Sequence, residues 1–213
     1  MGGKFTPEGK VLPFPGNTFL CHVDPQSEFY RALCTVQDEL QAHRLADHFA
    51  FLPKPSFHMT LFCGVSGSPL GSDGWPEGIP PDASLEQITA EFADRLTCTT
   101  FDTAFSVTPS SLSQPNSVTM QAATAKDERL LRKLRFELES LTGLYRGDVE
   151  SYSFHVSLAY LVRWLGERSA QELIMECARL FEAHLKNCAP IRFENVALCT
   201  FADMRHFNEV RRL

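Results

Sequence analysis

Two short segments of the chain combine residue types that can move protons to and from a substrate. The first is Phe57-His58-Met59-Thr60-Leu61 and the second is Phe154-His155-Val156-Ser157-Leu158. Each places a histidine two residues before a hydroxyl. Imidazole gains and loses a proton near neutral pH, so two histidines can divide the work of general base and general acid. A hydroxyl can donate a hydrogen bond to a phosphate oxygen, which makes phosphoester chemistry a natural use of the pair.

Both segments are predicted to be β-strands, because aromatic and branched residues flank each histidine and turn-forming residues follow each apolar run. Residues two apart in a strand point to the same side. Thr60 therefore shares a side with His58, and Ser157 shares one with His155. The apolar residues between them, and the phenylalanine before each histidine, point to the other side, where a core would hold them.

A single motif of this kind has a simpler interpretation. A histidine packed on an apolar strand, with a hydroxyl beside it, is common in protein cores, and short motifs often match by chance. Two near-identical copies make a functional site the better interpretation. A pattern repeated at wide spacing predicts a duplicated unit, whose pseudo-two-fold symmetry would bring both copies to one central cleft.

The pair resembles the signature of the two-histidine (2H) phosphoesterase superfamily, His-x-Thr/Ser-x with apolar x positions, present twice. His58-Met59-Thr60-Leu61 and His155-Val156-Ser157-Leu158 both match, and chain size and motif placement extend the resemblance over nearly the whole sequence. Pro15-Gly16-Asn17-Thr18 is similar to the uncharacterised DUF1868 branch. In the RNA-ligase-like (LigT) branch an arginine follows the second histidine by five residues. Tyr160 stands there in this chain, so that contact is not carried over; strand parity points Tyr160 away from the cleft unless the strand bends.

The resemblance implies an α+β fold of two pseudo-symmetric lobes, each an antiparallel sheet with helices outside, with a central cleft between them. It implies a hydrolase, a cyclic phosphodiesterase that opens a 2',3'-cyclic phosphate of a nucleotide or RNA end. His58 and His155 would be its catalytic residues, with Thr60 and Ser157 binding the substrate and no metal or cofactor. Which histidine is the base stays open.

Two alternatives remain beside this hypothesis. The first is a binding module of the same fold that holds a nucleotide or RNA end without turnover. The second is a metal hydrolase with His58 and His155 as ligands. It is disfavoured, because neither motif has a carboxylate or a third ligand nearby.

Composition restricts the partners further. With 44% hydrophobic and 22% charged residues and no apolar run of membrane-spanning length, no membrane association is expected. The formal net charge of −6 argues against tight binding to a DNA duplex or a long RNA. The seven cysteines are scattered without a Cys-x-x-Cys pair, which favours a reducing, cytoplasmic compartment. We expect a monomer.

Periodicity and caps predict the remaining elements of a single bilobal domain over residues 1–213, with an extended arm over 1–16. Helices are expected from Asp24-Pro25 to near His43, from a capping box at Ser84 to about Thr97, over Asp127–Leu141, and from a capping box at Ser169 to about Asn187. In the third helix the basic run (Lys126, Arg129, Arg132, Lys133, Arg135) is interleaved with acids, which predicts a solvated face. Strands are expected at 17–23, 49–52, 57–63, 103–108, 117–123, 152–162, 191–201 and 206–210, with a turn over 109–116.

The irregular segment 64–81 directly follows the first motif. One role for it is a lid over the cleft, with Trp75 stacking on a base. The commoner role of such a tryptophan is to anchor its own loop. Arg163 and Arg205 are candidate phosphate contacts, although no spacing supports either.

Overall fold

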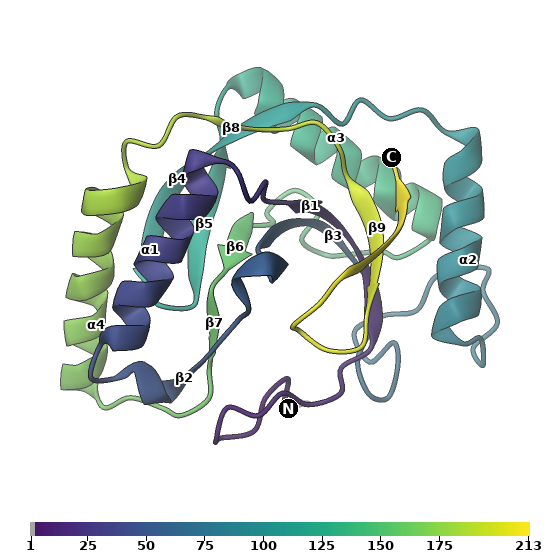
Figure 1. The fold of residues 1–213 in the computed structure, drawn as a ribbon. Coiled ribbons are helices and arrows are strands. Elements are labelled where there is room, and N and C mark those ends of the chain that lie inside the picture. The colour runs from purple at the N-terminus through teal and green to yellow at the C-terminus, as the bar shows by residue number, and fades with distance from the viewer. Residues whose placement is uncertain (1–2) are drawn as a thin grey trace.

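The computed structural model describes residues 3–213, apart from the side chains of residues 113 and 114, so residues 1–2 of the predicted arm lie outside it. Its strands are β1 (Gly16–His22), β2 (Phe49–Phe51), β3 (His58–Ser66), β4 (Phe105–Gln114), β5 (Ser117–Ala122), β6 (His155–Ser157), β7 (Ala159–Leu161), β8 (Ile191–Phe193), β9 (Ala197–Phe201) and β10 (Asn208–Arg212). Within these residues one curled sheet of eight strands has the order β10-β9-β1-β3-β6-β5-β4-β8, and β2 pairs with β7 separately (Figure 1).

Helices cover the outer, convex face of this sheet. They are α1 (Glu28–Ala42), α2 (Leu85–Arg95), α3 (Ala125–Thr142) and α4 (Glu167–Leu180), the last continued by a π-helical turn over Phe181–Leu185. Their apolar stripes join one core with the strand residues that point outward. Every strand pair in the sheet is antiparallel. The predicted α+β fold, with antiparallel strands inside and helices outside, is therefore confirmed.

The sheet has two matching halves that meet between the two motif strands. On one side of the junction lie β3, β1, β9 and β10, and on the other β6, β5, β4 and β8. These four-strand halves are the two predicted lobes, joined here into one continuous sheet. None of the helices in the described part of the chain combines the length and hydropathy that crossing a membrane requires.

A second apolar cluster lies on the inner, concave face of the sheet. We call it the inner-face cluster: Leu20, Leu52, Ala197, Cys199, Phe201, Met204 and Phe207, with Phe5, Phe14 and Tyr160 packed against it. Leu20 lies opposite Thr60 in the β1–β3 pair, so this cluster shares a face with the motif hydroxyl. The N-terminal arm and the β9–β10 loop thus cover part of the inner face.

Two predicted helix starts are wrong. Asp24 accepts from the Gln26 amide in a turn, and α1 begins only after Ser27, whose hydroxyl accepts from the Tyr30 amide (3.0 Å). α4 begins after Gly166 rather than at Ser169. The capping box predicted at Ser84 is present, with Gln87 as its partner.

Three predicted strands also differ. The strand predicted at 191–201 is interrupted at 194–196, and its two parts, β8 and β9, lie in opposite halves of the sheet. β4 continues through most of the predicted turn 109–116, because a register shift after Pro109 accommodates a residue without an N–H group. The predicted strand 152–162 is broken at Leu158, whose amide and that of Ala159 both donate to the Asn116 carbonyl. Gln37, buried in α1, donates to the carbonyls of Leu52 and Leu158 and holds the break in place.

The predicted solvated face of the third helix is wrong at one residue. Arg135 on α3 is only 1% exposed. Its guanidinium stacks on the Tyr152 ring (4.0 Å) and donates to the carbonyls of Leu61 and Val149 and to the carboxylate of Asp148. Buried in this way, Arg135 ties the segment before β6 to strand β3.

Candidate active site

The two motif strands are neighbours at the centre of the sheet. β3 and β6 run antiparallel with Met59 opposite Val156. Both of these side chains are fully buried in the outer core. Because successive side chains alternate between faces, the residues on either side of each point to the inner face.

This register brings four polar side chains together. It sets His58 beside Ser157 and Thr60 beside His155, so each histidine lies opposite the hydroxyl of the other motif. The histidines are diagonal neighbours, a relation that gives backbone separations of about 7–8 Å. Two imidazoles that reach inward from such positions can bracket one phosphoryl group.

The same hydrogen bond fixes both imidazoles. His58 Nδ1 lies 2.7 Å from the Ser56 carbonyl oxygen, and His155 Nδ1 lies 2.9 Å from that of Ser153. A carbonyl oxygen can only accept, so Nδ1 carries the proton in each ring. In the neutral ring the lone pair is therefore on Nε2, at the edge away from this carbonyl.

The surroundings of the two histidines differ. The Phe207 ring of the β9–β10 loop packs against His58 with centroids 4.2 Å apart. Burial is the main cause that lowers the pKa of His58 to about 4; the charges of His22, His155 and Lys4 act in the same direction, and the hydrogen bond to Ser56 opposes them. His58 is consequently neutral at pH 7. His155 faces the Tyr152 ring at 6.2 Å.

Three polar residues that sequence reasoning missed adjoin the motif residues. Thr119 and Ser117 of β5 lie opposite His155 and Ser157, and His22 of β1 lies opposite His58. The alternation of polar and apolar residues in 117–120 was the available signal for the first two. His22 closes the strand predicted at 17–23, but nothing in the sequence pairs that strand with the first motif.

Tyr160 reaches the inner face because the chain bends after β6, whereas the alternation of side chains was counted along a straight strand. β6 ends at Ser157, and Tyr160 belongs to β7 in the smaller sheet. Its ring packs on Phe5 (5.3 Å between centroids), and its hydroxyl donates to Met204 Sδ (3.4 Å). The position therefore places an aromatic ring, with Lys4 Nζ 3.4 Å from its oxygen, beside the site.

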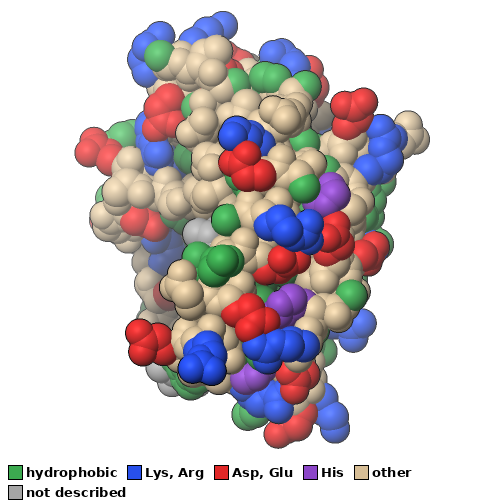
Figure 2. Space-filling model, turned by 90° about the vertical axis from the view of Figure 1, so that its left-hand side faces the viewer, with side chains coloured by type: hydrophobic (Ala, Val, Ile, Leu, Met, Phe, Trp, Pro, Cys, Tyr) green, Lys and Arg blue, Asp and Glu red, His purple; other side chains and the backbone are tan. Residues whose placement is uncertain are grey.

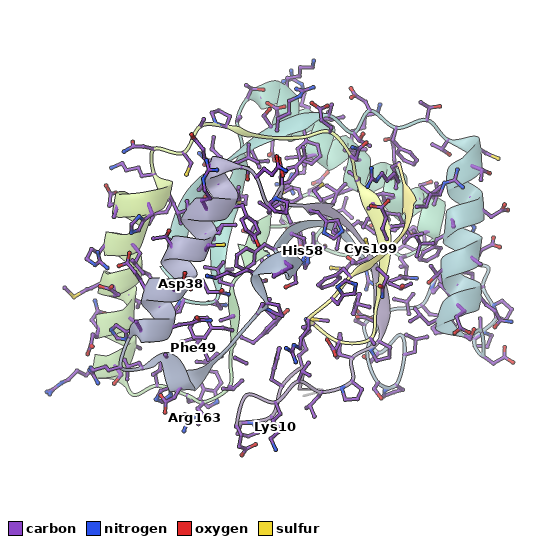
Figure 3. The ribbon with its side chains drawn as sticks, viewed as in Figure 1. Lys10, Asp38, Phe49, His58, Arg163 and Cys199 are labelled. Carbon is purple, nitrogen blue, oxygen red and sulfur yellow. The ribbon has the colours of Figure 1, made fainter. Side chains whose placement is uncertain are left out.

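The other candidate contacts lie elsewhere. Arg163 is paired with the Asp47 carboxylate (2.5 Å), and Figure 3 shows it at the outer edge, far from His58. Arg205 is exposed in the β9–β10 loop. The Trp75 indole donates to the Ile79 carbonyl (3.0 Å) and packs against the outer core, which is the anchoring role.

A cavity of about 530 Å³ opens beside His22. Its walls are the end of β1, the start of α1, the β8–β9 connection and β10. Acidic side chains predominate among its charged residues: Asp24, Glu28, Glu194 and Glu209, against Arg192 and Arg212. Both arginines are already paired, with Glu194 (2.6 Å) and Glu209 (2.8 Å).

The two motif histidines have no further metal ligands grouped with them in the described part of the chain. Among residues 3–213, no three or more His, Cys, Asp or Glu side chains are grouped so as to hold a metal ion.

Comparisons with known proteins relate this geometry to a family. The family model 2H-phosphodiest, described as a domain of unknown function (DUF1868), matches residues 4–117. The crystal structure of the conserved protein of unknown function ATU0111 from Agrobacterium tumefaciens str. C58 aligns with a TM-score of 0.87 at 31% identity, covering 99% of this chain and 90% of its own. A crystal structure described as a phosphoesterase aligns with a TM-score of 0.52 at 10% identity, covering 95% and 98%, which is a likeness of fold alone. No curated protein matches the chain.

The family model covers more than half of the chain, and the 31% identical relative covers nearly all of it. On the family model, this chain belongs to the 2H-phosphodiest family, the DUF1868 proteins.

Proposed function

We propose that this protein is a phosphoesterase that hydrolyses the 2',3'-cyclic phosphate of a nucleotide, with His58 and His155 as paired general base and general acid. The matched setting of the two imidazoles supports this function most. Both project from adjacent strands onto one face, and both are held by a carbonyl at Nδ1. Each therefore presents Nε2 for proton transfer, and the chemistry needs no metal ion.

His58 is the base in this proposal, since its burial keeps the imidazole neutral at pH 7. Its Nε2 removes a proton from water as the water oxygen bonds to phosphorus. The bond from phosphorus to the ribose oxygen on the opposite side breaks, and the Nε2–H of a protonated His155 supplies a proton to that oxygen. The product is a phosphate monoester with a free hydroxyl; His58 has gained one proton and His155 has lost one.

Thr60 and Ser157 bind the phosphoryl oxygens that do not leave. Each hydroxyl lies opposite a histidine of the other motif, which supports a role as donor to the group held between the imidazoles. Hydrogen bonds to a charged acceptor are worth about 1.5–3 kcal/mol each. They gain strength as negative charge builds up on the phosphoryl oxygens in the transition state.

The cavity beside His22 suits the nucleoside part of a small substrate. His22 lies opposite His58, so a ligand whose phosphate is held by the histidines can extend into this space. The volume of about 530 Å³ lies within the range of pockets for small ligands. Its carboxylates accept hydrogen bonds from a base or ribose but repel further phosphates, which favours a mononucleotide over a long RNA.

The decisive experiment is hydrolysis of the four nucleoside 2',3'-cyclic phosphates in excess chelator. Wild type is compared with His58→Ala, His155→Ala and the control His184→Ala, a histidine that pairs with Glu39 among the outer helices. We expect each motif variant to lose at least about 100-fold in kcat, the lower range of general acid–base catalysis, while the control keeps wild-type turnover.

Turnover that survives in both motif variants would refute paired-histidine catalysis. If wild type binds a nucleotide without hydrolysing any of the four compounds, the protein is instead a binding module of the same fold. Activity lost on chelation and restored by a divalent cation would point to a metal hydrolase.

A further inference from the structure

The N-terminal arm is anchored on the same face as the two histidines. Phe5 and Phe14 pack against the inner-face cluster, and the Phe14 amide donates to the Ala202 carbonyl (2.9 Å). A bridge between Phe5 and Val11 and a bond from the Leu12 amide to the Lys4 carbonyl (2.9 Å) fold the arm back on itself. The arm thus has a defined path, and its lysine has a defined place.

Lys4 is held there by aromatic rings rather than by an acid. Its ammonium lies 5.0 Å from the centroid of the Phe14 ring, 5.1 Å from that of Tyr160, and 3.4 Å from the Tyr160 hydroxyl oxygen. It forms no ion pair with a carboxylate of residues 3–213, whereas Lys54, for example, pairs with Asp38. Aromatic faces attract a cation without neutralising it, so its charge stays available to an anion.

The charge of Lys4 acts on the inner face of β3. It lowers the pKa of His58, and it lowers that of the Cys63 thiol against the larger, raising effect of desolvation. The cations that act on His58 are His22, His155 and Lys4. Imidazole titrates near neutrality, whereas a lysine ammonium is a cation throughout that range.

Given the proposed phosphoesterase function, we infer that Lys4 is the phosphate-binding cation of the site. The hydroxyls of Thr60 and Ser157 are neutral donors, and the phosphoryl group gains negative charge in the transition state. A fixed ammonium beside it supplies the compensating charge. The ligand class is a phosphoryl anion, recognised by a lysine that reaches the cleft from outside the two motif strands.

The test compares Lys4→Met with Lys4→Arg and Lys10→Met. Methionine keeps an unbranched apolar stem over the Phe14 and Tyr160 rings and removes the charge, while arginine keeps the charge. Lys10 is a second lysine of the same arm. Figure 3 shows it at the tip of the arm, away from His58. The readouts are KM and kcat for adenosine 2',3'-cyclic phosphate and, separately, the dissociation constant of inorganic phosphate by calorimetry.

We expect Lys4→Met to weaken phosphate binding and raise KM by about 10- to 100-fold, the effect of losing one hydrogen bond to a charged group. Lys4→Arg should recover most of this loss, and Lys10→Met should match wild type. The pKa of His58, followed by NMR titration, should rise in Lys4→Met because the charge that lowers it is gone. Lys4→Arg, which keeps the charge, should leave this pKa close to that of wild type.

The outcomes separate this inference from the function on which it rests. Normal turnover with equal phosphate affinity in wild type and Lys4→Met would overturn the role of Lys4 and leave the phosphoesterase standing. Phosphate binding that depends on Lys4, without any turnover in wild type, would support Lys4 and overturn the hydrolysis. A wild type that neither turns over the cyclic nucleotide nor binds phosphate would overturn both.

Discussion

His58 and His155 make the same hydrogen bond, but an aromatic ring packs closely against only one of them. Both Nδ1 atoms bond to a carbonyl two residues earlier, but only His58 lies against Phe207 at 4.2 Å. Removing that imidazole from water disfavours its charged form, so its pKa falls to about 4. His58 is then neutral at pH 7, as a general base must be.

This asymmetry predicts the acid side of the pH profile. A base must be deprotonated, so kcat/KM should rise with pH through the pKa of His58 and fall off only near pH 4, well below the ordinary value of 6.5. The measurement is kcat/KM for adenosine 2',3'-cyclic phosphate from pH 3.5 to 9. Phe207→Ala exposes the ring to water and should move this limb to higher pH.

An acid limb between pH 6 and 7 in wild type, unmoved in Phe207→Ala, would show that His58 is not the base. The alkaline limb reports loss of the proton from the acid, which His155 carries in the proposed mechanism.

Among individual residues, the sequence was sufficient to select the four motif side chains and not to describe their surroundings. The repeated spacing of histidine and hydroxyl is enough to predict that His58, Thr60, His155 and Ser157 share strand faces. Phe207 lies far from both motifs in the chain, and its contact with His58 depends on the path of the β9–β10 loop. The position of Lys4 could not be predicted for the same reason, because the arm has no hydrophobic periodicity that would indicate where it packs.

Among the elements, the segment before β6 is fixed by a helix on the outer face. Arg135 of α3 donates to the Val149 carbonyl and the Asp148 carboxylate, and it also donates to Leu61 of β3. One side chain therefore joins strand β3 to the segment that leads into β6. Its stacking on Tyr152, three residues before His155, extends this support to the second histidine.

Arg135→Met should destabilise the fold and misplace His155. Four hydrogen bonds from a buried guanidinium are lost, and the carbonyls that accepted them are left without that donor, so we expect the free energy of unfolding to fall by about 2–4 kcal/mol. Urea unfolding measures this loss, and kcat should fall in the variant that still folds. Arg129→Met, an exposed arginine on the same helix, is the control.

Equal stability of the two arginine variants would mean that Arg135 contributes no more than a surface residue.

The sequence pattern predicts one solvated face for both because charges of both signs alternate there. Burial of a charged side chain depends on partners contributed by distant segments, which helical periodicity does not reveal. The helix starts predicted at Asp24 and Ser169 were also wrong, because more than one residue near each start can precede a first helical turn. α1 begins after Ser27 and α4 after Gly166.

For the whole molecule, charge is dispersed rather than gathered. The chain carries a formal net charge of −6, and on the face in Figure 2 basic and acidic side chains are intermixed. Pairs such as Arg179 with Glu39 (2.6 Å) tie the helices to one another. The cavity beside His22 is itself lined mostly by acids among its charged residues. On that face and in the cavity, carboxylates accompany the cations that a nucleic-acid backbone would need.

A longer RNA should therefore not be a better substrate than a mononucleotide. We expect kcat/KM for an RNA decamer ending in a 2',3'-cyclic phosphate to be at or below that for the mononucleotide, because added phosphates meet carboxylates rather than free cations. Parallel assays at 50 and 300 mM NaCl check the electrostatic origin. A tenfold preference for the decamer that disappears with salt would contradict this picture.

The overall architecture was only partly accessible from the sequence. The repeat of the motif and the order of helices and strands indicated α+β with an internal near-repeat, and the family resemblance implied two related lobes. Pairing of β3 with β6 joins segments far apart in the chain, so no local pattern encodes it. A one-residue slip of that pair would turn the side chains of one motif to the outer core, which is why the buried Met59 and Val156 matter to the site.

The route of the chain through the two halves has a consequence for synthesis on the ribosome. β1 pairs with β3 on one side and with β9 on the other, and β9 and β10 come from the last residues of the chain. While the middle of the protein is being translated, the β9-facing edge of β1 has no partner, and such an edge invites pairing with another chain. The nascent chain can join β3 to β6 before this edge is covered. A ribosome stalled after β8 would leave a chain with both motifs in place and an open, aggregation-prone edge.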